Sequence, residues 1–189
     1  MKYLFDLAAN PIFVSGGCEQ LPDHLSDFHF SKLPMLLRIF LSTDGTVSKA
    51  IEAAFNESLN VSLISESTLT VAPNAESLLH REINLIGKKS GQIYTYASSY
   101  LNLSYVPDNL LDELKNSGHG VGWLLRKMNK EQYREIFDLG YSEDLPEQFR
   151  PKGFSKGVYR IYCIRVGGER FMEITEHYPL DFYTNSRVV

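Results

Sequence analysis

The chain has 189 residues, of which 43% are hydrophobic, and a formal net charge of -4 at pH 7. This length is enough to bury a substantial core, and we expect one domain over residues 1–189. The 19 Lys and Arg residues are scattered along the sequence, which argues against a nucleic-acid-binding surface. No apolar run approaches the roughly 18 residues of a membrane helix, so no membrane partner is expected.

Cysteine usage and the N-terminus predict a reducing compartment. Cys18 and Cys163 are too few for a disulfide framework and lie outside any C-x-x-C motif. The first residues lack the basic segment and apolar run of a secretory signal. We therefore expect a cytoplasmic protein, or one of the plastid stroma if it is organelle-encoded. The five histidines show no metal-ligand spacing, so no metal site is predicted.

The first half of the chain is predicted to hold an irregular arm, two helices and three strands. Pro and Gly interrupt any period in the arm. Apolar residues then recur at helical spacing, and after that they alternate as in strands. The arm covers residues 1–30, the helices residues 32–42 and a segment from Thr46 onward, and the strands residues 59–70, 77–86 and 92–100. The last two strands are joined by a short Gly-bounded loop and should form a hairpin.

The second half is predicted to hold two short helices and three strands. The helices are expected at 107–115 and 123–128, and the strands at 133–144, 158–166 and 169–178. Gly167-Gly168 between the last two strands is a strong turn signal. Strands outnumber helices and come in hairpins, so we predict an α+β fold in which helices pack on an antiparallel sheet.

The glycine-rich segment over residues 118–122 has two interpretations. It reads Gly-His-Gly-Val-Gly and precedes a predicted helix. The preferred interpretation is a helix C-cap followed by a turn. The alternative is that its backbone N–H groups face a bound anion. Because it does not follow a strand and lacks the dinucleotide-binding spacing, a nucleotide site is not expected.

Arg81 is the most anomalous residue in the predicted sheet. Side chains alternate across a strand, and Arg81 shares its face with three apolar residues: Leu79, Ile83 and Leu85. A guanidinium is costly to bury without a partner. Its position therefore predicts a partner acid or a bound anion, unless the strand register differs from the one that the pattern suggests.

Glu176 is a second charge among apolar residues, because it shares a face with Met172 and Ile174 on the last predicted strand. Three interpretations remain open. Arg81 and Glu176 could form an ion pair with each other, or both could lie in solvent if the faces slip by one residue. Alternatively, both line a pocket in which Arg81 binds a carboxylate and Glu176 a hydroxyl or ether oxygen.

Other polar residues on these strands have simpler explanations. His80 and His177 lie on the faces opposite Arg81 and Glu176, so we expect them to be exposed. Tyr94, Tyr96 and Tyr100 are expected to share one sheet face, where they pack against neighbours.

Four short motifs, in this order, resemble those of the chorismate pyruvate-lyase family. They are the helix Thr46-Val47-Ser48-Lys49-Ala50-Ile51-Glu52, the strand segment Arg81-Glu82-Ile83, the segment Gly120-Val121-Gly122-Trp123-Leu124-Leu125, and Thr175-Glu176 with Pro179 close behind. The resemblance covers roughly residues 30 to 183. A loop around 140–157 is longer than in the better-known bacterial members, and in this respect the chain resembles the cyanobacterial and plastid-type branch.

The resemblance implies a six-stranded antiparallel sheet with helices around an internal ligand cavity, a fold shared with UTRA ligand-binding domains. It also implies conversion of chorismate into 4-hydroxybenzoate and pyruvate without metal or cofactor. By the same resemblance, Arg81 and Glu176 would be the catalytic residues, and backbone groups at Val47, Val121 and Gly122 would contact the ligand. The partner is then a small aromatic carboxylate, and a monomer or weak dimer is expected.

The sequence departs from the family pattern at two of these positions. Val47 stands where better-known bacterial members have Met, and Trp123 stands where they have Arg. Arg126 and Lys127 are candidates to replace the lost charge, although both are more simply solvated helix residues. The alternative function is a UTRA-like protein that binds a small anion without catalysis. A regulator would need a winged helix ahead of the sensor, and only about 30 residues precede the first predicted helix.

Overall fold

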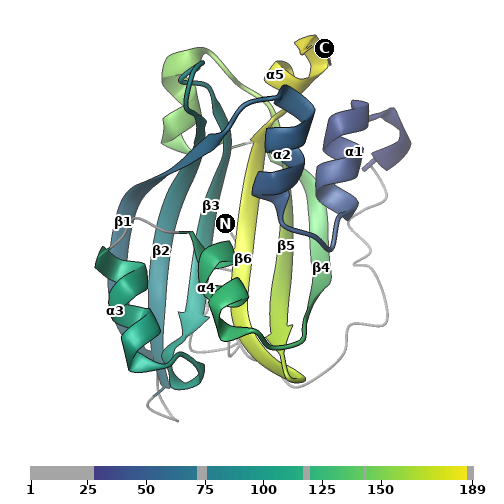
Figure 1. Ribbon diagram of the computed structural model, residues 1–189. Coiled ribbons are helices and arrows are strands. Elements are labelled where there is room, and N and C mark those ends of the chain that lie inside the picture. The colour runs from purple at the N-terminus through teal and green to yellow at the C-terminus, as the bar shows by residue number, and fades with distance from the viewer. Residues whose placement is uncertain (1–27, 72–75, 117–119, 143, 187–189) are drawn as a thin grey trace.

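The computed structural model describes residues 28–71, 76–116, 120–142 and 144–186. Its centre is a single antiparallel sheet with the strand order β1-β2-β3-β6-β5-β4 (Figure 1). The strands are β1 (Leu59–Val71), β2 (Glu76–Gly87), β3 (Ile93–Asn102), β4 (Gln132–Ser142), β5 (Gly157–Val166) and β6 (Glu169–Pro179). The predicted α+β class and six-stranded antiparallel sheet are confirmed.

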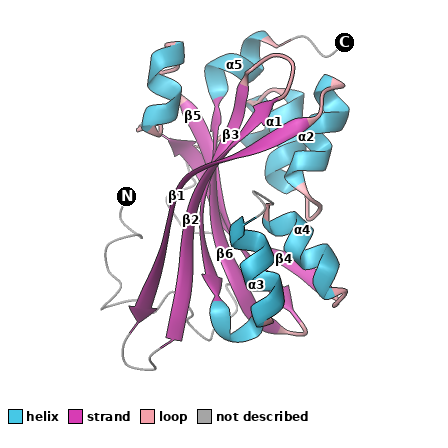
Figure 2. Ribbon diagram, turned by 60° about the vertical axis from the view of Figure 1, so that its left-hand side comes forward, coloured by secondary structure: helices cyan, strands magenta, loops and turns pink. Residues whose placement is uncertain are grey.

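The helices α1 to α4 pack against one side of the twisted sheet, which we call the covered face (Figure 2). The α-helices are α1 (Met35–Ser42), α2 (Val47–Phe55), α3 (Asp108–Asn116), α4 (Val121–Met128) and α5 (Leu180–Asn185). Short 3-10 turns occur at Phe30–Lys32, Leu103–Tyr105 and Glu147–Lys152. No helix among these described segments is long and apolar enough to cross a bilayer. Most of the predicted arm, together with Gly118 and His119, lies outside the described residues.

Two three-stranded units build the sheet, and β3 pairs with β6 where they meet. This pairing brings the middle of the chain beside its C-terminal strand. The final hairpin turns at Gly167 and Gly168, which have φ values of 61° and 88°. Two consecutive residues with positive φ are the requirement of a two-residue hairpin turn whose twist matches its strands. The sequence prediction of this turn is confirmed.

Helices α1 and α4 begin at positions that differ from the prediction. Leu33 is extended, with ψ of 151°, because the proline ring of Pro34 disfavours a helical residue before it. Helix α1 therefore starts at Met35, whereas residues 32–42 were expected. Gly120 is the N-cap of α4, with φ of -80° and ψ of 163°. The preferred interpretation of the glycine segment as a C-cap is thus wrong for Gly120, because such a cap needs positive φ.

Two apolar clusters fill the space between the helices and the covered face. One packs α3 and α4 on the sheet through Leu114, Leu124 and Leu125, which contact core residues of β2, β3, β5 and β6. The other packs α1, α2 and α5 over the opposite end, with Phe40 and Tyr178 stacked at 6.2 Å between ring centroids. The boundary between the clusters, near the middle of the covered face, is where the charged residues lie.

The opposite face of the sheet is more buried than predicted. His80 and His177 were expected to be exposed, but both are half-buried. The ring of His80 lies against Tyr100, and its Nε2 is 3.0 Å from the Ser98 hydroxyl. Burial lowers the pKa of His177 to about 4. The exposure prediction failed because alternation shows only that the two faces differ, and both faces of this sheet are packed.

The three tyrosines of β3 do not share one face. A register shift between Leu85 and Ile86 places Tyr94 on the side of α2, where its ring lies 4.6 Å from that of Phe55. Tyr96 instead packs with Leu145 and Phe149 behind the sheet. A bulge turns one extra side chain onto a face, and the alternation pattern does not reveal this.

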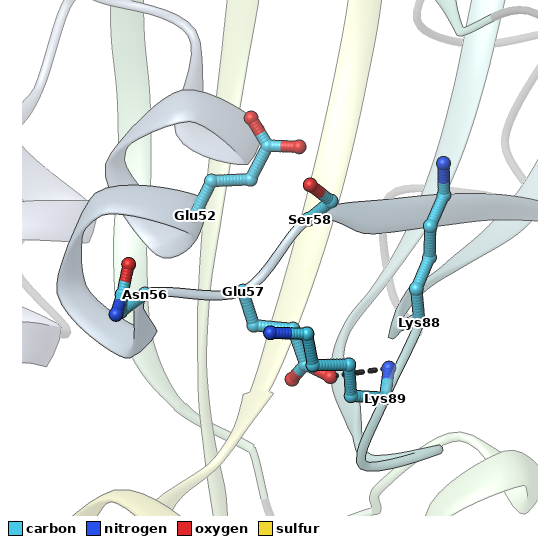
Figure 3. A pocket seen from close by; sticks show the side chains of 6 residues that line it. All are labelled: Glu52, Asn56, Glu57, Ser58, Lys88 and Lys89. Atoms are coloured by element: carbon cyan, nitrogen blue, oxygen red, sulfur yellow. Dashed lines mark hydrogen bonds between the residues drawn. The ribbon is translucent and has the colours of Figure 1, made fainter.

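Glu57 organises the turn between β2 and β3. Its carboxylate accepts hydrogen bonds from the backbone N–H groups of Lys89 and Ser90 at 2.5 and 2.6 Å, and from the Tyr94 hydroxyl at 2.8 Å. Figure 3 shows the Lys89 side chain across this carboxylate and Lys88 extending away from it. Glu57 lines an adjoining cavity of about 460 Å³, but its oxygens already accept hydrogen bonds from the protein itself.

Replacing Glu57 with Gln should lower the melting temperature at neutral pH. The Ser90 N–H and the other donors hold the pKa of Glu57 at about 2, below the roughly 4.3 of an unfolded Glu. A depressed pKa contributes stability that is present above the unfolded value and is lost as the pH falls toward 2. Thermal melts across this range should show the two proteins converge on acidification. A difference that stays constant with pH would contradict the charged role of Glu57.

Candidate active site

Arg81 lies on β2 and points to the covered face, as its strand pattern predicted. It is only 2% exposed. Its Nε is 2.8 Å from Oε2 of Glu66, the residue directly opposite on β1. Burial lowers the pKa of Arg81 from its ordinary value, and the Glu66 carboxylate partly offsets this effect. Arg81 is therefore a buried cation at the boundary between the two apolar clusters.

A bulge in β1 creates the pairing between Arg81 and Glu66. The register shifts between Leu63 and Ser65, so Ile64 is an extra residue in the strand. Without that residue, Glu66 would face the other side of the sheet. The bulge turns it onto the covered face, where it meets the guanidinium.

Glu176 lies on β6, is 6% exposed, and also points to the covered face. Its Oε2 accepts hydrogen bonds from Arg160 Nε at 2.8 Å and from the Tyr178 hydroxyl at 2.5 Å. Its Oε1 accepts one from the Tyr162 hydroxyl at 2.9 Å. A carboxylate oxygen has two lone pairs, so Oε1 retains the capacity to accept one more hydrogen bond.

Arg81 and Glu176 share the covered face but do not pair with each other. Arg81 is opposite Ser99 on β3, and Glu176 is opposite Ala97 on the same strand. Two strand spacings and a two-residue offset place their Cα atoms roughly 12 Å apart. The side chains between them are short, and they leave more room under the helices than Leu or Ile would. Ile174 completes the surroundings.

Two of the three interpretations left open by the sequence are thereby corrected. Arg81 and Glu176 do not form an ion pair with each other, because each meets a different partner on a neighbouring strand. They do not lie in solvent either, because both are buried. The strand faces follow the predicted register, with Arg81 and Glu176 on the packed side.

Arg160 is a site residue that the sequence prediction missed. It is fully buried on β5, opposite Glu176. The signal was available, because Arg160 shares its face with Val158, Tyr162 and Ile164, the same kind of anomaly that identified Arg81. Burial opposes its charge, but the Glu176 carboxylate raises the pKa of Arg160 above its ordinary value.

Helices α2 and α4 present their N-termini side by side over the sheet. Val47 is the first residue of α2, and Val121 and Gly122 are the first two of α4. A Cβ on Gly122 would lie 3.4 Å from the Thr46 side chain, which is the N-cap of α2. Among the described residues, neither helix has a side-chain N-cap hydrogen bond. The first N–H groups of a helix have no intrahelical partner and attract anions.

A cavity of about 390 Å³ opens between these two helices. Its lining includes Gly120, Gly122 and Trp123 from α4 and its N-cap, and it reaches Val61 and Leu85 on the sheet. Leu85 lies on the same face of β2 as Arg81, four residues away. The cavity therefore lies beside the covered face at the point where the two helix N-termini meet.

The cavity also has cationic residues at its edge. Lys49, Lys88 and Arg126 line it together with Glu52, which pairs with Lys49 at 2.6 Å. Arg126 is thus exposed, as expected, and faces the cavity. Lys127 instead lies over the Trp123 ring, 5.8 Å from its centroid.

The fold resembles ligand-binding domains of bacterial regulators. PhnF from Mycobacterium smegmatis superposes with a TM-score of 0.57 at 12% identity, over 74% of this chain and 66% of that structure. The ligand-binding domain of a GntR-family regulator from Bordetella bronchiseptica gives a TM-score of 0.51 at 12% identity, over 64% and 85%. At such low identity the likeness shows a shared fold and nothing about activity.

The sequence relatives are enzymes. The chorismate pyruvate-lyase of Mycobacterium leprae is 29% identical over 166 residues, which cover 82% of this chain and 79% of the relative. The chorismate pyruvate-lyase of Mycobacterium tuberculosis H37Rv is 23% identical over 169 residues, covering 82% and 84%. Residues 41–185 match the family described as Chorismate pyruvate-lyase Rv2949c-like, which includes every site residue discussed above. The chain therefore belongs to the Rv2949c-like chorismate pyruvate-lyase family.

Proposed function

We propose that this protein converts chorismate into 4-hydroxybenzoate and pyruvate, with Arg81 and Glu176 as its catalytic residues. The observation that carries the proposal is a buried cation and a buried anion on one sheet face, with short side chains between them. This arrangement suits an aromatic acid that has a carboxylate at one end and a hydroxyl group at the other. Membership of a lyase family adds independent support.

In the proposed complex, the ring of the substrate lies over Ala97 and Ser99. Arg81 binds the ring carboxylate, since a guanidinium matches a carboxylate in geometry and charge. The backbone N–H groups at Val47, Val121 and Gly122 bind anionic oxygens of the substrate, as uncapped helix N-termini favour. In this proposal the substrate enters through the cavity between α2 and α4, whose lining reaches Leu85 on the same strand face as Arg81.

The proposed chemistry is an elimination that makes the ring aromatic. The C4–H bond breaks and gives its electron pair to the ring, while the ether bond at C3 breaks and releases the enolpyruvyl group. That group takes up a proton and becomes pyruvate, and the C4 hydroxyl stays on the product. The protein's task is to orient and desolvate the substrate. Glu176 Oε1 accepts a hydrogen bond from the C4 hydroxyl, or takes part in proton transfer through an adjacent water.

The test is incubation of the purified protein with chorismate, followed by chromatographic measurement of both products. Equal amounts of 4-hydroxybenzoate and pyruvate should form, faster than in a protein-free control. If neither product exceeds the control at high protein concentration, the lyase proposal is wrong. Tight binding of 4-hydroxybenzoate without turnover would instead identify a non-catalytic anion-binding protein with the same fold.

A further inference from the structure

We propose that Arg160 is a positioning residue that holds the Glu176 carboxylate in a fixed position relative to the start of α2. This role rests on the proposed lyase function, because it concerns the placement of Glu176 against a substrate. Arg160 and Glu176 lie on the two strands of the β5–β6 hairpin, and the third partner is the segment between α1 and α2. One guanidinium thus joins two parts of the chain that are distant in sequence.

The contacts of Arg160 divide between Glu176 and the backbone. Its Nε donates to Glu176 Oε2 at 2.8 Å. Its Nη1 donates to the carbonyl oxygen of Thr43 at 2.9 Å and lies 3.4 Å from that of Leu41. Thr43 is four residues before Val47, so the same side chain that orients the carboxylate also restrains the segment that leads into α2. The guanidinium carbon lies over the Tyr162 ring, 4.5 Å from its centroid.

Stability alone does not explain a charge at this position. A buried ion pair can often be replaced by apolar residues of similar volume without loss of stability. Arg160 also has a buried Nη2 atom that makes no hydrogen bond to any of the described residues. A buried donor without an acceptor is unfavourable. The arrangement is therefore better suited to fixing the position of Glu176 than to stabilising the sheet.

Arg160 differs in charge from the other groups that face Glu176. Arg160 and Tyr162 face the carboxylate from β5, Tyr178 from β6 and Tyr183 from α5. Burial raises the pKa of all three tyrosines, with Glu176 contributing, so they stay neutral in any ordinary assay. Arg160 is thus the one cation among the described residues that contact this carboxylate.

Two substitutions separate the charge of Arg160 from its shape. Arg160→Met removes the charge and keeps most of the side-chain length, whereas Arg160→Lys keeps a charge but cannot reproduce the planar fork. Arg165→Met is the matched control, because Arg165 lies on the same strand, faces the other side and pairs with Glu135 at the same 2.8 Å. Folding of each variant is checked by circular dichroism.

We expect Arg160→Met to lower kcat for chorismate on the order of 100-fold, with KM changed less than about threefold. This difference between kcat and KM is expected because a displaced carboxylate impairs the reaction more than it impairs substrate binding. Arg160→Lys should lower kcat about 10-fold. Arg165→Met should match the wild type.

A folded Arg160→Met variant with wild-type kcat would overturn the positioning role. If that variant does not fold, Arg160→Lys decides through the same comparison of kcat with KM. If the wild type itself has no lyase activity, the proposed function fails. The positioning role is then tested by calorimetry, which compares the binding of 4-hydroxybenzoate with that of benzoate. A preference for the hydroxylated ligand that Arg160→Lys abolishes supports positioning of Glu176. Equal preference in both proteins, or no binding at all, contradicts it.

Discussion

Replacing Arg81 with Ala should lower kcat/KM for chorismate on the order of 1000-fold, mostly through a higher KM. Arg81 is the buried cation that we propose binds the ring carboxylate. Removing one partner of a buried, hydrogen-bonded charge pair costs about 2–5 kcal/mol, and the lost contact is made in both the ground state and the transition state. Steady-state kinetics over a wide range of chorismate concentration would measure the change.

Glu66→Gln is the control for this experiment. Glu66 faces Arg81 on β1 and pairs with it at 2.8 Å, so both substitutions break the same ion pair. Only Arg81→Ala removes the proposed carboxylate ligand. We expect Glu66→Gln to keep kcat/KM within about threefold of the wild type, because the amide oxygen can still accept a hydrogen bond from Arg81. If Arg81→Ala binds chorismate as tightly as the wild type does, or if both variants lose activity equally, Arg81 does not bind the substrate carboxylate.

Glu176→Gln should lower kcat by about 100- to 1000-fold and leave KM nearly unchanged. Glutamine keeps one oxygen, which can accept from Arg160 and Tyr178 in place of Oε2, while its amide nitrogen can donate to the Tyr162 hydroxyl. It lacks the charge needed to handle a proton. Loss of a positioned acid or base typically costs a factor of 100 to 10,000 in rate, and an effect confined to kcat indicates a role in the transition state.

Glu173→Gln provides a matched comparison on the same strand. Glu173 lies three residues before Glu176 and points to the opposite face, where burial raises its pKa to about 7. It is therefore a partly buried carboxylate on the same strand that does not face the proposed site. Single-turnover measurements should find this variant unchanged in its chemical step. Equal losses in the two variants would mean that Glu176 acts through the fold and not through the reaction.

Local signals explain the parts of the fold that the sequence predicted. The turn at Gly167 and Gly168 depends on residues that adopt positive φ, and the face of Arg81 depends on simple alternation within one strand. Both are decided over a few consecutive residues. The start of α1 at Met35 is equally local, because it follows from the effect of Pro34 on the residue before it.

The partners of the charged residues could not be predicted in the same way. Glu66 meets Arg81 only because an extra residue in β1 reverses the alternation, and a bulge leaves no clear mark in the pattern. Glu176 was ambiguous because both faces of β6 carry polar residues and both are packed. Arg160 carried a readable signal, but its pairing with Glu176 depends on the register of two strands. The N-termini of α2 and α4 come together only in the tertiary structure, so no local sequence pattern predicts their proximity.

A crystal structure with 4-hydroxybenzoate bound would show whether Arg81 and Glu176 hold the two ends of the ligand. We expect the ligand on the covered face over Ala97 and Ser99, with its carboxylate on Arg81 and its hydroxyl within hydrogen-bond distance of Glu176 Oε1. The N–H groups that begin α2 and α4 should also contact it. Ligand density elsewhere, for example beside Glu57 and Lys88, or a reversed orientation with the carboxylate at Glu176, would contradict the proposed roles of both residues.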